Sequence, residues 1–284
     1  MQPNASSHSR ASSLLAMMHL PSCVMMGFAV VLGETIASPT VPAQAAFWGF
    51  MTGFLLLSVH MVLNALDCGT DTGSQQRRIL RTDVVRPKEA FSFAIVLASF
   101  GLLSAANLGL FTLMIALLSV VIIVAYHVKL KKHGLLGNAF VGANMAIIFI
   151  FAGFAVGKLT WPLAIFAMMV FLVSMARENM KNLAKTLSDS SIGAKLEPVS
   201  VRYAETGKQS ALLFLGAVVL SVLPLVLGLV SNYYIPLVAI CDIGFLLTAY
   251  SMIAGPTPRN AERNENYVLV WLSFGLLALI LGTI

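Results

Sequence analysis

The residues best suited to chemistry in this sequence are three oxygen-bearing side chains that follow a long apolar run. Asn64, Asp67 and Asp71 come directly after a run that ends in FLLLSVHMVL, and their i, i+3, i+7 spacing places them on one face of a helix. Carboxylates stacked on one face repel each other unless a cation joins them, and Mg²⁺ prefers such hard oxygen ligands together with substrate phosphates. The spacing is compatible with a magnesium site or with a solvated helix end.

A second polar segment, MARENMKNLAKTLSDSSIGAKLEPVSVRY, spans residues 175–203 and mixes amide, acidic and basic side chains. Its first turns carry Arg177, Glu178, Lys181 and Asn182. A diphosphate needs metal ions and basic donors together to neutralise its charge. The two polar segments therefore favour a diphosphate site across a cavity, although any single basic residue could serve only topology and attraction to anionic lipid.

The elements that must position these groups are membrane helices. The chain has 284 residues, is 58% hydrophobic and is only 11% charged, which is about half the charged share of a typical soluble domain. Spans in lipid must be helical because every backbone polar group needs an internal partner. We expect one membrane domain over 13–284 after a polar tail at 1–12. Its nine spanning helices are expected near 13–37, 46–66, 89–105, 108–127, 135–157, 160–181, 209–230, 233–253 and 266–284.

The basic residues are distributed very unevenly between the two sides of these spans. Seventeen of the eighteen Lys and Arg residues fall on the N-terminal tail or after every second helix, and Lys158 alone falls on the other side. Such a skew is the positive-inside rule. It predicts a multi-pass protein of the cell membrane with its N-terminus and both polar segments in the cytoplasm. Because topology accounts for the net charge of +6, no nucleic-acid partner is expected.

The order of helices and polar segments resembles the UbiA-type intramembrane prenyltransferases. The likeness rests on five stretches in this order: HLPSCVMMGFAVVLGE, NALDCGTD, RRILRTDVVRPKEA, YHVKLKKHGLLGNAFVG and RENMKN…GAKLEPVSVRY. The resemblance implies an all-α membrane fold, with nine helices around a central cavity and two polar cytoplasmic loops capping it. It also implies transfer of a prenyl group from a prenyl diphosphate to an acceptor, within a bilayer of membrane lipid.

The resemblance leaves the acceptor open between a lipid and an aromatic compound. The stretch VMMGFAVVLGE and the form of the last motif resemble the archaeal ether-lipid branch, whose acceptor is the free hydroxyl of geranylgeranylglyceryl phosphate. The tetrapeptide GTDT at 69–72 instead resembles the quinone branch, which prenylates aromatic acceptors. Both alternatives require the same diphosphate chemistry.

The resemblance also implies roles for individual residues. Catalytic Mg²⁺ ligands are expected at Asp67, Asp71 and Asp189. Side chains that bind the diphosphate or another part of the substrate are expected at Asn64, Arg78, Lys131, Asn138, Arg177, Lys181, Asn182 and Lys185.

Several positions depart from the family pattern. His19 and Ser22 stand where the family usually has Arg and Asn, and Asn182 and Lys185 stand where its second motif has aspartates. Asp189 alone keeps a carboxylate in that motif. Either Lys185 supplies part of the charge of a second Mg²⁺, or the chain is a catalytically degraded, lipid-binding homologue.

Asp242 falls inside the eighth expected helix, far from the polar segments. A carboxylate at membrane depth is a functional candidate, or else a hydrogen-bonded packing group. A transporter would be expected to concentrate its charged residues and helix breaks near the midplane. Most charges here cluster at one side, which favours an enzyme with its polar site at the membrane boundary.

Overall fold

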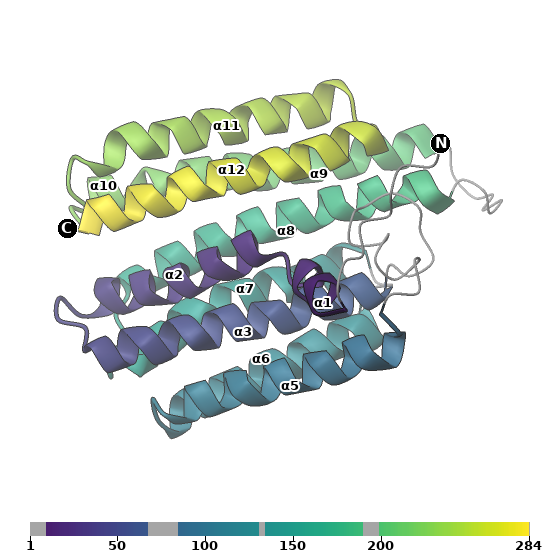
Figure 1. Ribbon diagram of the computed structural model, residues 1–284. Helices are drawn as coiled ribbons and strands as arrows, with labels where there is room; N and C mark the ends of the chain where they lie inside the picture. The colour runs from purple at the N-terminus through teal and green to yellow at the C-terminus, as the bar shows by residue number, and fades with distance from the viewer. Residues whose placement is uncertain (1–9, 68–84, 131–133, 190–198, 284) are drawn as a thin grey trace, which may run out of the picture.

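The protein is built from helices, as the computed structural model shows (Figure 1). The description covers residues 10–67, 85–130, 134–189 and 199–283, without the side chains of 10, 11, 67, 185–189 and 199–202. Within these ranges there is no strand. The helices are α1 (Arg10–Met17), α2 (Leu20–Ala37), α3 (Ala43–Asp67), α5 (Pro87–Ala106), α6 (Leu110–Val128), α7 (Leu135–Ala155), α8 (Pro162–Asp189), α9 (Val199–Ser221), α10 (Leu223–Val226), α11 (Tyr234–Ala254) and α12 (Pro258–Thr283).

Nine helices in the described part of the chain are long and apolar enough to cross a membrane, as expected. They lie roughly along one common direction (Figure 1), and successive spanning helices pack against each other from α2 to α12. α12 also packs against α2 and α8, so the order of helices closes into a ring. The all-α membrane fold predicted from the sequence is confirmed.

The first expected span is not one helix. The helix is interrupted between α1 and α2, where His19 adopts a left-handed backbone conformation with φ 52° and ψ 63°. Pro21 lies in the first turn of α2, where its missing N–H costs no hydrogen bond. The break lets a hydrogen bond of 2.7 Å join His19 Nδ1 and Ser22 Oγ.

Three helices extend farther along the polar segments than hydropathy alone predicted. α8 continues to Asp189 rather than ending near 181, α9 begins at Val199 rather than near 209, and α12 begins at Pro258 rather than near 266. A helix needs favourable backbone propensity and not apolar side chains, so polar turns continue it beyond the hydrocarbon region. The polar groups of α8 therefore belong to a helix and not to a loop.

The seventh span, expected as one helix over 209–230, instead ends its main helix early. α9 ends at Ser221, and a short α10 follows with Pro224 in its first turn. Proline cannot donate a backbone hydrogen bond inside a helix. The Tyr234 hydroxyl donates to the carbonyl oxygen of Ser221 at 2.9 Å, so a side chain of α11 satisfies a backbone group at this helix break.

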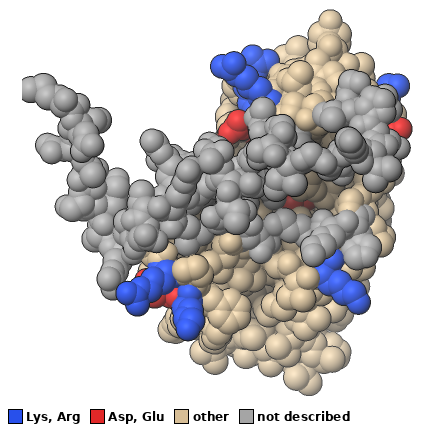
Figure 2. Space-filling view, turned by 90° about the vertical axis from the view of Figure 1, so that its right-hand side faces the viewer, with Lys and Arg blue, Asp and Glu red and all other residues tan. Residues whose placement is uncertain are grey.

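Charged and lipid-facing surfaces are separated. Large apolar side chains such as Leu103, Leu110 and Val219 are 60%, 69% and 74% exposed, as expected for faces turned to lipid. Among the side chains that the structure describes, Lys158 is the one cation at the end where α7 meets α8. The opposite end carries Arg86, Lys88, Lys129, Arg177, Lys181, Lys208, Arg259 and Arg263. Figure 2 shows this second end, with Lys and Arg side chains around its rim.

Candidate active site

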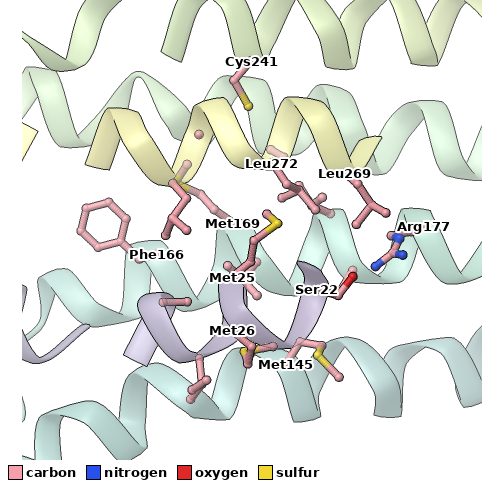
Figure 3. A pocket seen from close by; sticks show the side chains of 18 of the residues that line it. Ser22, Met25, Met26, Met145, Phe166, Met169, Arg177, Cys241, Leu269 and Leu272 are labelled. Carbon is pink, nitrogen blue, oxygen red and sulfur yellow. The ribbon is translucent and has the colours of Figure 1, made fainter. Parts of the chain in front are cut away.

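A cavity of about 200 Å³ runs between the helices of the ring. Its walls come from α2, α3, α7, α8, α9, α11 and α12, and apolar side chains make most of its lining. Figure 3 shows Phe166 toward one end, Arg177 toward the other, and Met25, Met26 and Met169 between them. Methionine side chains adapt to irregular apolar shapes. This lining is suited to a hydrocarbon chain with a charged group at one end.

The polar end of the cavity contains an arginine with an unmet donor. Arg177 Nη2 lies 3.6 Å from Glu265 Oε1 on α12. Arg177 Nε is buried and has no hydrogen-bond partner among the described residues. Ser22 lies at the same end (Figure 3). A buried guanidinium donor without a partner among the described residues, in the wall of a cavity, favours an anionic ligand.

Glu178 organises the neighbouring part of this polar end. The Tyr126 hydroxyl donates to Glu178 Oε1 at 2.8 Å, and Lys181 Nζ donates to Glu178 Oε2 at 3.0 Å. Glu178 is 4% exposed and Tyr126 is 1% exposed, so the interaction between α6 and α8 is shielded from water. It holds the Lys181 ammonium beside the cavity, where the sequence predicted a substrate ligand.

Three amide side chains form a second connection at this end. Asn182 Nδ2 donates to Asn138 Oδ1 at 2.7 Å, and Asn138 Nδ2 donates to Asn179 Oδ1. The structure therefore joins two predicted substrate ligands, Asn138 and Asn182, through direct contact between α7 and α8. The Asn182 bond uses its amide nitrogen as donor, so the contact fixes the side chain without engaging its carbonyl oxygen.

The α3 side contributes an oxygen that lacks a partner. Asn64 is 7% exposed, and its Oδ1 has no hydrogen-bond partner among the described residues. Asp67 is the last residue of α3, one helical turn beyond Asn64. A buried carbonyl oxygen on the face that leads to a carboxylate fits the ligand preference of Mg²⁺. The described side chains contain no cluster of three His, Cys, Asp or Glu that could hold a metal ion by themselves.

Some predicted site residues are outside the structural description. Asp71, Arg78 and Lys131 lie in undescribed segments, and the side chains of Asp67, Lys185 and Asp189 are not described although their backbones are helical. Their roles stay predictions. Of the residues brought together here, sequence reasoning did not assign Tyr126, Glu178 or Asn179 to the site. All three were present in quoted motifs, and only the contacts reveal what they do.

The UbiA prenyltransferase family matches residues 20–274 of this chain. The chain belongs to this family. This UbiA-family protein is 28% identical over 284 residues to the digeranylgeranylglyceryl phosphate synthase of Methanosarcina mazei, covering 94% of this chain and 97% of that one. It is 26% identical over 273 residues to the enzyme of the same name from Methanococcus vannielii, covering 94% and 96%. The protein is a prenyltransferase, as its motifs predicted.

Solved structures share its fold. One, of digeranylgeranylglyceryl phosphate synthase in membranes, matches with a TM-score of 0.70 and 24% identity over 96% of this chain and 98% of that one. A UbiA homolog from Archaeoglobus fulgidus bound to GPP and Mg²⁺ matches with a TM-score of 0.62 and 14% identity, covering 95% and 100%. At these identities the likeness concerns the fold of this UbiA-family prenyltransferase.

His19 gives the polar end of this prenyltransferase a weaker positive charge than the family's usual Arg would give. Burial, followed by the nearby positive charge of Arg177, lowers the pKa of His19 below its ordinary value. The charged form of His19 is therefore disfavoured at this position. The hydrogen bond to Ser22 uses its Nδ1, so the two residues that depart from the family pattern are paired with each other.

Asp242 lines the cavity wall on α11. The Ser221 hydroxyl donates to Asp242 Oδ2 at 2.7 Å, so the carboxyl group is hydrogen-bonded across α9 and α11. This contact supports the interpretation of Asp242 as a hydrogen-bonded packing group. The polar end that contains Arg177 and Lys181 is elsewhere in the cavity.

Proposed function

We propose that this prenyltransferase transfers a geranylgeranyl group from its diphosphate to the free hydroxyl of geranylgeranylglyceryl phosphate, with Mg²⁺, in ether-lipid synthesis. The observation that carries the proposal is one continuous cavity between the described helices, with an apolar body and a polar end built around Arg177 and Lys181. A prenyl diphosphate has the same division into a hydrocarbon chain and an anionic group. The names of the relatives support the lipid acceptor over an aromatic one.

The diphosphate is proposed to lie between α3 and α8. On the α8 side, the open donor of Arg177 and the ammonium of Lys181 bind its oxygens. On the α3 side, Asn64, Asp67 and Asp71 provide the oxygen ligands that hold Mg²⁺ against the same group. Asp189 of α8 is the further proposed metal ligand. Arg78, Lys131 and Lys185 are proposed to complete the positive surroundings.

The reaction breaks the bond between the allylic C1 and the diphosphate oxygen, and the electron pair leaves with the diphosphate. When bound, Mg²⁺ supplies Lewis-acid stabilisation of that leaving charge. Arg177 and Lys181 stabilise the same charge with fixed donors that need no reorganisation. The apolar lining holds the prenyl chain and keeps water away from the positive carbon. The hydroxyl oxygen of the acceptor then forms the new C–O bond.

The polar end is proposed to face the cytoplasm, because it carries nearly all of the cations. Cysteine labelling tests this orientation in a Cys68→Ser background. An impermeant thiol reagent added outside intact cells should not label Gln75→Cys or Ser190→Cys, and it should label Lys158→Cys on the other side. Labelling of either position on the polar side from outside would overturn the orientation.

Turnover of geranylgeranyl diphosphate by the purified protein tests the function. The acceptors are geranylgeranylglyceryl phosphate and an aromatic compound, 4-hydroxybenzoate, each with Mg²⁺ and with EDTA. We expect an ether product with the lipid acceptor, lost in EDTA. Transfer to the aromatic acceptor alone would establish the quinone-pathway alternative. Absence of turnover with both acceptors, together with retained binding of the donor, would indicate a degraded lipid-binding homologue.

A further inference from the structure

We propose that His60 binds the attacking hydroxyl of the acceptor and is the base that removes its proton. The proposal rests on the prenyl transfer proposed above. His60 belongs to α3, is 3% exposed and lines the cavity. The sequence contains no motif that singles it out. Three observations select it: its position along α3, its neighbours on α6, and the placement of the carboxylates in the cavity wall.

The position of His60 along α3 places it farther toward the interior of the cavity than the proposed metal ligands Asn64 and Asp67. His60, Asn64 and Asp67 are spaced i, i+4, i+7, so they share one helical face. Seven residues of α3 separate His60 from Asp67, which is about 10 Å along the helix at 1.5 Å per residue. Asn64, with its unpartnered Oδ1, lies between them. The imidazole is therefore the next polar group on this face toward the interior of the cavity.

The neighbours of His60 on α6 connect it to the proposed diphosphate site. The ring centroid of His60 lies 6.0 Å from that of Tyr126 and 5.2 Å from that of His127. The Tyr126 hydroxyl donates to Glu178, which also accepts the ammonium of Lys181. One tyrosine side chain thus separates His60 from the carboxylate that holds a proposed diphosphate ligand. His60 lies near the polar end of the cavity and not in its apolar body.

This placement matches the distances that the reaction requires. The allylic carbon would lie next to the bound diphosphate, and the attacking oxygen would approach it to about 3–3.5 Å on the side away from the leaving group. A base must then lie about 2.6–3.2 Å from that oxygen. His60, about 10 Å inward from Asp67 along α3, lies at a distance that leaves room for the diphosphate, the allylic carbon and the attacking oxygen between the metal ligand and the base.

Two carboxylates also line the described part of the cavity, and neither fits the role of the base. Both oxygens of Glu178 already accept hydrogen bonds, from Tyr126 and Lys181. The second is Asp242, whose depth follows from the register of α12 against its neighbours. Arg177 of α8 pairs with Glu265 of α12, and Leu279 of α12 packs against an apolar cluster that includes Leu163 and Phe166 near the start of α8.

Along α11, Cys241 lies against Gly275 of α12. The same register on α8 places Asp242 level with about residue 168. That is about nine residues from Arg177, or about 14 Å along the helix. A glyceryl phosphate head held at the polar end would not bring its hydroxyl to that depth. Among the described lining residues, His60 therefore fits the role of the base better than either carboxylate.

The proposed step balances without any further reactant. The hydroxyl oxygen gives an electron pair to C1, the diphosphate leaves with the pair of the broken C1–O bond, and the hydroxyl proton moves to a nitrogen of His60. The imidazolium releases that proton to water at the polar end after the product departs. An imidazole can bind a protein partner through one nitrogen and use the other as a base.

The test compares His60→Gln with His127→Gln in the full-length protein in detergent. His127 contacts the His60 ring but is not among the described residues that line the cavity, so its variant controls for loss of a ring. We expect His60→Gln to lower kcat of transfer about 100- to 10,000-fold, the usual contribution of a general base. The Kd for geranylgeranyl diphosphate with Mg²⁺ should stay within about twofold. His127→Gln should keep transfer within about threefold of the parent.

A second variant keeps the test decisive if His60→Gln unfolds. Added imidazole should restore transfer to His60→Ala and not to His127→Ala. Parent-like kcat in His60→Gln would overturn the base while leaving the proposed function intact. A loss of donor affinity in parallel with kcat would make His60 a diphosphate ligand, which also overturns the proposal. Absence of transfer by the parent protein with both acceptors would reject the proposed function and the base together.

Discussion

The two helix ends that form the polar site, those of α3 and α8, hold their functional groups in opposite ways. On α3, Asn64 keeps an oxygen without a partner among the described residues. On α8, Lys181 is held by Glu178, and Asn182 is held by Asn138. The α3 side thus presents acceptors that a cation would satisfy. The α8 side presents donors whose positions are fixed by neighbouring helices before any ligand binds.

The two sides of the proposed site thus divide metal binding from anion binding. Fixed donors stabilise charge that develops on a leaving group without reorganising. The departure of the second motif from the family pattern fits this division, because Asn182 and Lys185 replace negative charge on the α8 side with neutral and positive groups. The comparison can be tested by removing groups from each side in turn.

The largest effect is expected on the α3 side. Asp67→Ala and Asp71→Ala should each lower prenyl transfer about 1,000-fold or more, because the Lewis-acid contribution is several kcal/mol. Steady-state transfer at saturating Mg²⁺ measures the loss, and thermal unfolding in detergent should show that the fold is retained. Near-normal turnover of both variants would show that α3 does not hold the metal.

The next effect concerns the hydrogen bonds that Glu178 accepts from Tyr126 and Lys181 on the α8 side. Glu178→Gln removes the negative charge that holds Lys181 and should reduce the free energy of unfolding by about 1.5–3 kcal/mol, as for a hydrogen bond to a charged group. The midpoint of thermal unfolding in detergent measures it. Glu205→Gln, at an exposed position of α9, is the matched control and should leave the midpoint nearly unchanged. Equal midpoints for both variants would mean that Lys181 is not held by this contact.

A smaller effect is expected at Lys185. If its charge replaces part of a second Mg²⁺, Lys185→Ala should weaken diphosphate binding by about 1–3 kcal/mol, which corresponds to a roughly 5- to 150-fold higher Kd. Lys208→Ala, an exposed cation of α9, serves as the control for net charge. Parent-like affinity in Lys185→Ala, together with an inactive parent, would indicate decay of the second motif.

The smallest effect is expected when carboxylates are restored on α8. Restoring the family's carboxylates with Asn182→Asp and Lys185→Asp should make α8 resemble α3 and raise the Mg²⁺ concentration for half-maximal transfer by about two- to tenfold, because two negative charges then need neutralising. A titration of transfer against Mg²⁺ measures this shift. An unchanged or lower Mg²⁺ requirement would contradict the proposed division between the helices.

Local patterns in the sequence determined much of this protein. Apolar runs of about 20 residues fixed the nine spans, the uneven Lys and Arg distribution predicted one charged side, and the motifs identified the family. Asn138 and Asn182 were predicted as ligands from those motifs, and the structure joins them. These features are encoded locally, because hydropathy, helix period and charge act within a few turns of chain.

The tertiary structure decided which faces of these helices meet. Tyr126 and Glu178 are 52 residues apart and bond only because α6 and α8 converge at the polar end. The break at His19 and the lining position of His60 likewise follow from how the ring closes. A 3.6-residue period marks which residues share a face, but it does not say which neighbour that face contacts. Helix register and rotation depend on side-chain packing across the whole ring, which gave His60 and Glu178 their places at the cavity.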